Sequence, residues 1–353
     1  MYPVQSPIIK FLIWVLQRID KFLSRNRDSV QDKIKMVKKN QSTELNLRDC
    51  HFNKIPAEVF DLVWLQELDL SGNRITEIPE AIASLYNLTK LKLSNNQISK
   101  IPDSIYYLIH LQDLDLSGNY LVEVPKSIAY MSNLCQLDLS RNQFTTIPEP
   151  VTRLSCLSKL DLHNNQIKGI PNSVNRLSKL TKLDLSCNHI KDFPESLTRL
   201  ANLLELNLDN NQIQKIDKSI DRLYNLHNLK LSGNQLEEIP ESFALLPMID
   251  LSIQGNILKR PPQTEAEMGM DAIREFFRTN QTEEETSTKL SLTSYYLVLE
   301  FLKIIHKEIP TSDSDTSVAE EERNRLYAKL EKFIERLREW GIDVDDNGNS
   351  ESE

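Results

Sequence analysis

Aspartates recur every 23 residues in the middle of the chain. They are Asp115, Asp138, Asp161 and Asp184. A row of carboxylates can attract a basic partner, and together with histidines it can bind a metal ion or exchange protons. His163 and His189 each follow one of these aspartates closely. They would form at most a weak metal or acid–base pair, and we interpret both as exposed polar residues.

The sequence lacks the short motifs of common catalytic and nucleotide-binding sites. It contains no G-x-x-x-x-G-K-[ST] phosphate loop, no G-x-S-x-G turn, no H-E-x-x-H motif and no C-x-x-C pair. The four cysteines are scattered, which favours free thiols in a reducing compartment over zinc ligands or a disulfide framework. We therefore predict no catalytic residue, no cofactor and no metal site, and we expect that the protein is not an enzyme.

The elements that position the aspartates follow from a repeated leucine pattern. Leu65-x-x-Leu68-x-Leu70-x-x-Asn73 recurs in register at a 23-residue period, with one step of 22 residues at the end, and Cys50 takes the asparagine position in the first unit. The pattern gives ten units. Its asparagine column contains Asn73, Asn96, Asn119, Asn142, Asn165, Asn188, Asn211, Asn234 and Asn256. A proline column follows it in most units, and Asp217 takes the proline position once.

Each unit contains one short strand in this interpretation. The leucines of L-x-L point one way and the residues beside them point the other way. The proline disfavours a second paired strand and favours an extended or 3₁₀ return. No unit can bury its leucines alone, so the units must stack into a continuous core. We predict that the asparagine amides satisfy backbone groups where the chain leaves each strand.

This pattern resembles that of the leucine-rich repeat proteins. The 23-residue subtype, L-x-x-L-x-L-x-x-N-x-[IL]-x-x-[IL]-P, is similar to that of bacterial and Ras-associated scaffold members, and the resemblance covers residues 42–262. It implies an α/β fold, a horseshoe-shaped solenoid of about ten repeats with a parallel concave sheet. We expect a helical cap before the repeats and an α-helical hairpin after them.

Residues that point outward from the strands are the candidates for binding a partner. The four aspartates would form an acidic strip of roughly 14 Å at about 4.8 Å per strand. The strip would recruit a protein with a basic or mixed-charge surface. Alternatively, aspartate is this subtype's consensus residue and serves solubility. The candidate residues are Asp69, Lys92, Asp115, Tyr120, Asp138, Arg141, Asp161, His163, Asp184, His189 and Asp209.

Charge is distributed unevenly along the 353 residues. The net charge is −9 and the sequence pI is about 5.4, which argues against nucleic acid as a partner. Residues 1–40 contain nine Lys and Arg against three Asp, whereas residues 283–353 contain eighteen Asp and Glu against nine Lys and Arg. The repeats therefore lie between a basic flank and an acidic one.

The flanks divide the chain into four predicted parts. Residues 1–41 form a basic amphipathic helical cap, residues 42–262 the repeats, residues 263–282 a cap helix with the start of a linker, and residues 283–353 an acidic helical region with a disordered tail. The apolar stretch Ile8–Leu16 is too short to span a bilayer and has no cleavage site.

Both flanks leave alternatives open. The N-terminal helix either covers the first repeat or lies on an anionic membrane surface with Phe11 and Trp14 at the interface. The C-terminal hairpin either packs on the repeats, self-associates through its helix with 4-3-4-3 apolar spacing, or docks elsewhere.

The leading functional hypothesis is a cytoplasmic, non-enzymatic scaffold that binds a partner protein on the concave face. One alternative is a bacterial effector that is delivered into a host cell without a cleavable signal peptide. A second is a peripheral membrane protein anchored through residues 1–27.

Overall fold

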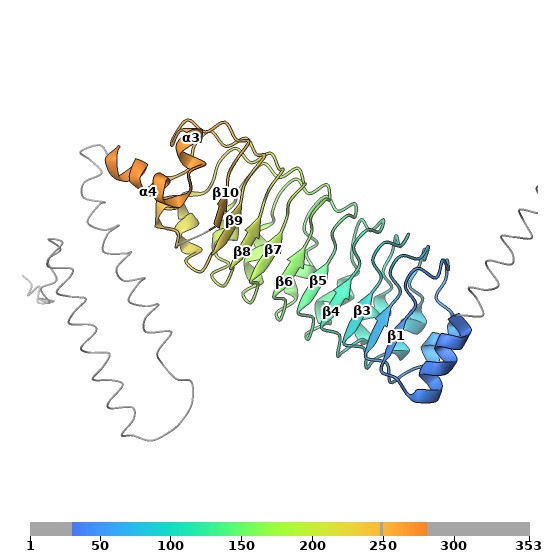
Figure 1. The fold of residues 1–353 in the computed structure, drawn as a ribbon. Helices are drawn as coiled ribbons and strands as arrows, with labels where there is room; N and C mark the ends of the chain where they lie inside the picture. The colour runs from blue at the N-terminus through green and yellow to red at the C-terminus, as the bar shows by residue number, and fades with distance from the viewer. Residues whose placement is uncertain (1–29, 248–249, 281–353) are drawn as a thin grey trace, which may run out of the picture. The chain divides into compact units, whose positions relative to one another are not determined.

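The structure is a computed structural model that describes residues 30–247 and 250–280 of the chain (Figure 1). It divides into two units at Arg274, and residues 275–280 are the described part of the second unit. The amphipathic helix predicted within residues 1–27 and the hairpin predicted within residues 283–353 lie outside the described residues.

Ten three-residue strands form one parallel sheet in sequence order. Each central leucine lies beside the central leucine of the next strand, as Leu114 does beside Leu137. The strands are β1 Glu44–Asn46, β2 Glu67–Asp69, β3 Lys90–Lys92, β4 Asp113–Asp115, β5 Gln136–Asp138, β6 Lys159–Asp161, β7 Lys182–Asp184, β8 Glu205–Asn207, β9 Asn228–Lys230 and β10 Asp250–Ser252. The predicted parallel sheet of about ten repeats is confirmed.

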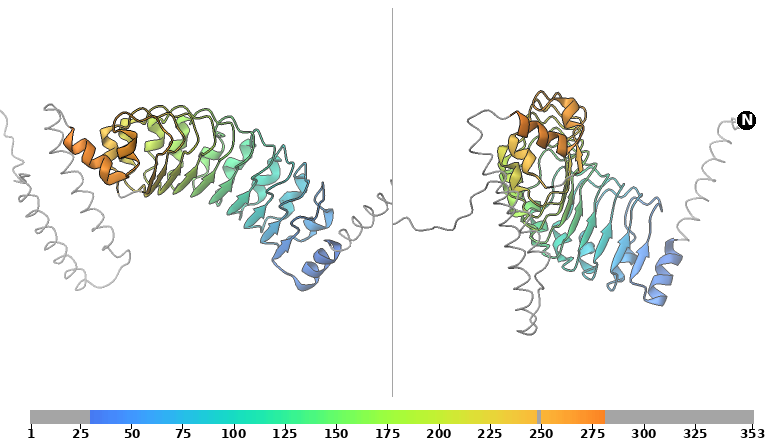
Figure 2. Two further views of the ribbon diagram at one scale, coloured as in Figure 1. Left: turned by 45° about the horizontal axis from the view of Figure 1, so that its top comes forward. Right: turned by 60° about the vertical axis from the view of Figure 1, so that its left-hand side comes forward.

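A short helix, mostly 3₁₀, follows each of the first nine strands on the opposite side of the repeats (Figure 2). The helices are η1 Ala57–Asp61, η2 Glu80–Ser84, η3 Asp103–Tyr107, η4 Lys126–Tyr130, η5 Val151–Arg153, η6 Asn172–Arg176, α2 Glu195–Thr198, η7 Lys218–Arg222 and η8 Glu241–Leu245. We call them together the 3₁₀ layer. Seven of them begin directly after a proline of the column, as the column predicts. The exceptions are η5, which begins after Pro150 rather than after the column residue Pro148, and η7, which begins after Asp217, whose side chain accepts a hydrogen bond from the Ser219 N–H.

The core lies between the sheet and the 3₁₀ layer. The two inward leucines of each of the first nine strand regions, such as Leu68 and Leu70, are buried, and so are helix residues such as Ile82. In β10 the central Leu251 is half-buried. Because every repeat buries its apolar residues against its neighbours, the core runs through the whole stack.

The asparagine column holds the turn after each strand. The Asn142 amide donates to the carbonyls of Leu139, at 3.1 Å, and of Leu116 in the preceding repeat, at 3.0 Å. Its Oδ1 accepts from the Leu121 N–H at 3.0 Å. All nine asparagines make this set of contacts and all are buried. They form a continuous ladder that ties each repeat to the one before it.

Helical segments cover both ends of the described stack. Residues 30–40 are helical with Val30 and Ile34 buried, and the Gln31 amide donates to Glu58 in the first repeat. At the other end lie α3, Gln263–Ala266, and α4, Met270–Thr279. Ile273 and Phe277 are buried, whereas Phe276 is half-buried. Within the described residues, none of the helices combines the length and apolarity needed to cross a bilayer.

Candidate functional site

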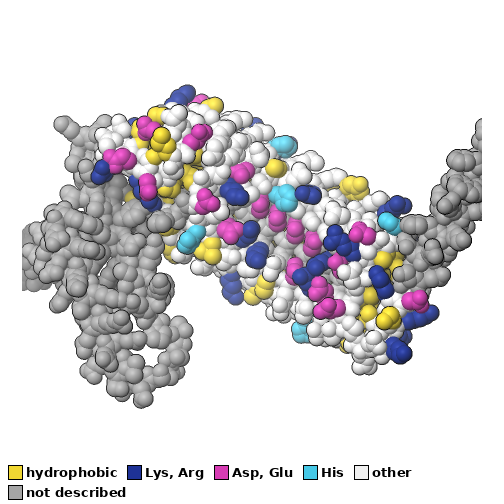
Figure 3. Space-filling model, viewed as in Figure 1, with side chains coloured by type: hydrophobic (Ala, Val, Ile, Leu, Met, Phe, Trp, Pro, Cys, Tyr) yellow, Lys and Arg dark blue, Asp and Glu magenta, His cyan; other side chains and the backbone are white. Residues whose placement is uncertain are grey.

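Four of the predicted aspartates lie side by side at the ends of neighbouring strands. Asp115, Asp138, Asp161 and Asp184 are paired in register across β4 to β7, and all four are half-buried. Figure 3 shows acidic and basic side chains together over these strands. We call these four residues the aspartate row.

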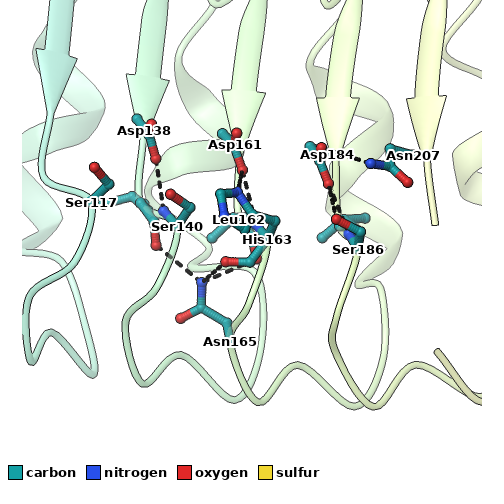
Figure 4. A network of polar contacts seen from close by, with 12 residues as sticks. Ser117, Asp138, Ser140, Asp161, Leu162, His163, Asn165, Asp184, Ser186 and Asn207 are labelled. Atoms are coloured by element: carbon teal, nitrogen blue, oxygen red, sulfur yellow. Dashed lines mark hydrogen bonds and ion pairs between the residues drawn. The ribbon is translucent and has the colours of Figure 1, made fainter. Parts of the chain in front are cut away.

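Each carboxylate of the aspartate row has a local structural task. Asp138 Oδ1 accepts a hydrogen bond from the backbone N–H of Ser140 at 2.9 Å, and Asp161 Oδ1 accepts one from His163 at the same distance (Figure 4). Asp115 and Asp184 accept the equivalent bonds from residues two positions further on, and Asn46 and Asn207 do so with their amide oxygens. A short side chain with an acceptor oxygen therefore stabilises the chain where it leaves the strand.

The second oxygen of most row members faces outward. Asp184 Oδ2 accepts from the Asn207 amide at 2.8 Å. The Oδ2 atoms of Asp115, Asp138 and Asp161 accept no hydrogen bond from any described residue. These three atoms remain available for a partner's donors.

Asp69 and Lys92, which the sequence places in the same column, offer less surface. Asp69 is only 7% exposed and its Oδ1 accepts the Ser71 N–H at 2.9 Å. Lys92 is half-buried and forms an ion pair with Glu67 at 3.3 Å. At the far end, Asp209 accepts the Ser232 N–H of the next repeat at 2.7 Å.

The remaining candidates lie at or beyond the ends of the strands. His163 Nδ1 is 2.8 Å from Asp161 Oδ1, so this histidine contacts the aspartate row. Arg141 directly precedes the ladder residue Asn142. It is exposed and has a positive φ of 54°. Tyr120 and His189 follow ladder asparagines, and their backbone N–H groups donate to Ile98 and Ile167 in the loop beyond the strand. The structure thus brings His163 to the aspartate row and places Tyr120 and His189 in the loops beyond the strands.

Lysines flank the aspartate row on the same face. Lys90 pairs with Asp113 at 3.4 Å, and Lys182 pairs with Glu205 at 2.7 Å. A shallow hollow of about 260 Å³ lies over these strands. Its lining contains Lys90, Lys92, Asp113, Asp115, Gln136, Asp138, Lys159, Asp161, Lys182 and Asp184. Sequence analysis missed Lys90, although its position at the start of a strand is a signal that identifies it.

Neighbouring groups in the hollow shift the pKa values of Asp138 and Lys182. Burial raises the pKa of Asp138, and repulsion from the neighbouring Asp161 and Asp115 adds to this, while hydrogen bonds from Ser140 oppose it. The hydrogen bond to Glu205 raises the pKa of Lys182. Within the described residues, no group of three or more His, Cys, Asp and Glu side chains has the arrangement of a metal site.

A second, shorter set of asparagines was missed by sequence analysis. Asn87, Asn133, Asn202 and Asn225 each donate to a backbone carbonyl 24 residues earlier, at 2.7–2.8 Å. Their recurrence at multiples of 23 residues is the signal that identifies them. They tie neighbouring repeats together between the 3₁₀ layer and the next strand.

Comparison with known families agrees with this architecture. A leucine-rich repeat model matches residues 42–98, 109–167 and 155–213, and two further models of the same repeat match residues 86–128 and 225–246. These matches together cover more than half of the chain, which belongs to the leucine-rich repeat proteins. Among curated proteins, none matches the sequence significantly.

Solved structures with the same fold come from bacteria and plants. A leucine-rich repeat protein of Leptospira interrogans is 33% identical, with a TM-score of 0.58 over 60% of this chain and 54% of that one. The ectodomain of the Arabidopsis thaliana receptor kinase GASSHO1/SCHENGEN3, in complex with Casparian strip integrity factor 2, is 32% identical, with a TM-score of 0.51 over 58% of this chain and 26% of that one.

The Arabidopsis receptor kinase HAESA, in complex with the peptide hormone IDA and the co-receptor SERK1, is 27% identical, with a TM-score of 0.55 over 61% of this chain and 38% of that one. The chain thus spans about half of the Leptospira protein and smaller parts of the plant receptors.

Proposed function

We propose that this protein is a non-enzymatic scaffold that binds a partner protein of mixed charge on its sheet face. The observation that carries the proposal is the hollow over β3 to β7, in which the aspartate row runs between lysines. A partner with a row of basic side chains and acidic neighbours would complement this face.

The aspartate row is preorganised for such a partner. The turn hydrogen bonds fix one oxygen of each carboxylate, so that binding immobilises little additional side-chain freedom. The free Oδ2 atoms of Asp115, Asp138 and Asp161 can then accept charge-assisted hydrogen bonds from Lys or Arg of the partner. The solved plant receptors with the same fold hold peptide and protein ligands, which supports a binding role for this chain.

The test is affinity capture from a cell lysate with a variant that neutralises the row but keeps its turns. Asp115→Asn, Asp138→Asn and Asp161→Asn together remove three charges, and asparagine keeps the turn bond, as Asn46 and Asn207 show. We expect the variant to lose the partner that the wild type captures, and we expect capture by the wild type to weaken as salt concentration rises.

A matched control removes three exposed acidic charges away from the strands. Glu123→Gln, Asp192→Asn and Glu238→Gln lie on loops, and this variant should capture the partner as the wild type does. Equal capture by the row variant and the wild type would contradict the proposal. A cytoplasmic location, delivery into a host cell and anchoring through residues 1–27 stay predictions from the sequence.

A further inference from the structure

The 3₁₀ layer carries an exposed apolar surface in its N-terminal half. Val63, Tyr86 and Ile109 occupy the same position in repeats 1, 2 and 3, and they are 37%, 45% and 54% exposed. Tyr107 and Tyr130, at the ends of η3 and η4, are 50% and 76% exposed. We call these five residues the apolar strip.

Ring contacts through Tyr106 link the two strip tyrosines of repeats 3 and 4. The Tyr106 ring lies 4.1 Å from the Tyr107 ring and 6.3 Å from the Tyr130 ring, measured between centroids. Aromatic side chains that are held by neighbours bind with a small loss of conformational freedom, which makes them frequent anchors at interfaces.

Acidic residues outnumber basic ones in the helices and turns that carry the apolar strip. In repeats 1 to 4 these helices and turns contain Glu58, Asp61, Glu80 and Asp103, which we call the acidic border, and one basic residue, Lys126. This half of the layer therefore carries three net negative charges, and an apolar ligand with basic residues would complement it.

The C-terminal half of the layer has the opposite character. The equivalent helices and turns of repeats 5 to 8 contain six basic residues and three acidic ones, Glu149, Glu195 and Asp221. Where repeats 3 and 4 have Tyr107 and Tyr130, repeats 5 to 8 have Arg153, Arg176, Arg199 and Arg222. Glu149 pairs with the first two arginines and Glu195 with the last two. Repeats 1 to 4 thus combine exposed apolar residues with an acidic excess, whereas repeats 5 to 8 have a basic excess and two exposed large apolar residues, Leu204 and Tyr224.

We propose that the apolar strip is the docking site for residues 8–27 of the same chain. This segment carries eleven large apolar residues between Ile8 and Leu23, among them Trp14, and five basic residues against one Asp. The chain also has apolar segments at residues 290–309 and 320–340, but in each of these the Lys and Arg equal the Asp and Glu in number. Among the three, only residues 8–27 match the acidic border.

The connection to the repeats places the segment within reach. Residue 31 is anchored beside η1, because the Gln31 amide donates to Glu58 Oε1 at 3.0 Å. The apolar strip begins in that same repeat at Val63. Twenty residues in a helix would extend about 30 Å. Three repeat spacings measure about 14 Å at the sheet, so the segment is long enough to cover the strip even where the stack is wider.

Hydrogen exchange measured by mass spectrometry on the full chain tests the proposal. The strip variant carries Tyr86→Ser, Ile109→Ser and Tyr130→Ser, all at exposed positions, so that the core is left intact. We expect the amides of residues 8–27 to exchange at least about tenfold faster in this variant than in the wild type.

A matched control removes equally exposed apolar residues elsewhere. Val122→Ser, Tyr224→Ser and Ile257→Ser change side chains that are 57%, 41% and 55% exposed, and Tyr224 occupies in repeat 8 the position of Tyr86. This variant should exchange as the wild type does. Equal exchange of residues 8–27 in the wild type and the strip variant would overturn the proposal.

Light scattering tests whether a second copy of the chain, rather than residues 8–27, covers the apolar strip. If the wild type is a dimer that the strip variant converts to a monomer, with exchange of residues 8–27 unchanged, the strip binds a second copy and the proposal is wrong. A charge variant adds an independent arm, since Glu80→Lys with Asp103→Lys should also speed exchange of residues 8–27. No effect of that variant would refute the role of the acidic border.

Discussion

Two columns of short polar side chains hold the same turns in this protein, and they differ in burial. Asn142 lies in the asparagine ladder, is 7% exposed and uses both its amide nitrogen and its oxygen on backbone groups. Asp138 lies in the aspartate row, is half-buried and uses one oxygen on the Ser140 N–H. The first side chain has no atom left for a partner, whereas the second has one free oxygen.

Within one repeat, the buried asparagine can therefore only stabilise the fold, whereas the half-buried aspartate can also contact a partner. A buried amide whose donors and acceptor are all used can only stabilise the fold. A half-buried carboxylate can stabilise the turn with one oxygen and bind with the other. Two alternatives for these aspartates follow from the sequence, recruitment of a partner and a consensus role in the repeat. One carboxylate can serve both, because each role uses a different oxygen.

The largest effect should come from removing a ladder asparagine. Asn142→Ala leaves the buried Leu121 N–H and the carbonyls of Leu116 and Leu139 without their partner. We expect a loss of about 2–4 kcal/mol in the free energy of unfolding. Urea denaturation followed by circular dichroism measures it, and a loss no larger than that of Asp138→Ala would break the comparison between the two columns.

Removing one member of the aspartate row should cost less. Asp138→Ala deletes the turn bond from the Ser140 N–H, which can then donate to water at this half-buried position. We expect a loss of about 1 kcal/mol in the same denaturation experiment. If stability is unchanged, the turn bond does not matter and the aspartate serves the surface alone.

Asp138→Asn should keep the turn bond and change mainly the dependence on pH. Because burial and neighbouring carboxylates raise the pKa of Asp138 in the folded state, the folded protein binds more protons than the unfolded chain just above the ordinary aspartate value of about 3.9. Stability contributed by this group therefore falls as pH rises through that range.

The uncharged variant lacks this penalty. Its advantage in unfolding free energy over the wild type should be largest at pH 7 and should shrink as pH approaches the ordinary aspartate value. Denaturation of both proteins at pH 7 and near pH 4 measures this difference in unfolding free energy. If the advantage of the variant grows as pH falls, the pKa of Asp138 is lowered in the folded state and the prediction is wrong.

The smallest effect should come from the exposed ion pairs of the 3₁₀ layer. Glu149 contacts Arg153, Arg176 and Ser173, more partners than Asp138 has, but all of them lie at the surface. Glu149→Gln should leave the denaturation midpoint unchanged within error at physiological salt. A clear shift would mean that the number of bonds, rather than burial, decides what a polar side chain contributes here.

The sequence was sufficient to predict the repeat architecture because a single pattern recurs ten times. Leucine spacing set the strands, and proline set the starts of the 3₁₀ helices. The Asp217 interruption proved to be a different way to begin the same turn, since its carboxylate accepts the Ser219 N–H.

The exposure of the candidate binding residues was harder to predict, because aspartates in the same column of the repeat differ in burial. Asp69 occupies the same position as Asp138 yet is buried. Tyr120 and His189 share the sequence neighbourhood of the strands but lie in the loop beyond them. Burial depends on the side chains of adjacent repeats, which the pattern of a single repeat does not contain.

The two glutamate bridges of the 3₁₀ layer join repeats in pairs. Glu149 fastens repeat 5 to repeat 6, and Glu195 fastens repeat 7 to repeat 8. Among the described residues, no ion pair joins repeat 6 to repeat 7 on this side. Repeats 6 and 7 are joined on this side by an amide instead, since the Asn202 side chain donates to the Ser178 carbonyl at 2.8 Å. Because salt screens exposed ion pairs, we expect the glutamate contacts within the two pairs of repeats to weaken as ionic strength rises, and the amide contact between the pairs to be less sensitive to it.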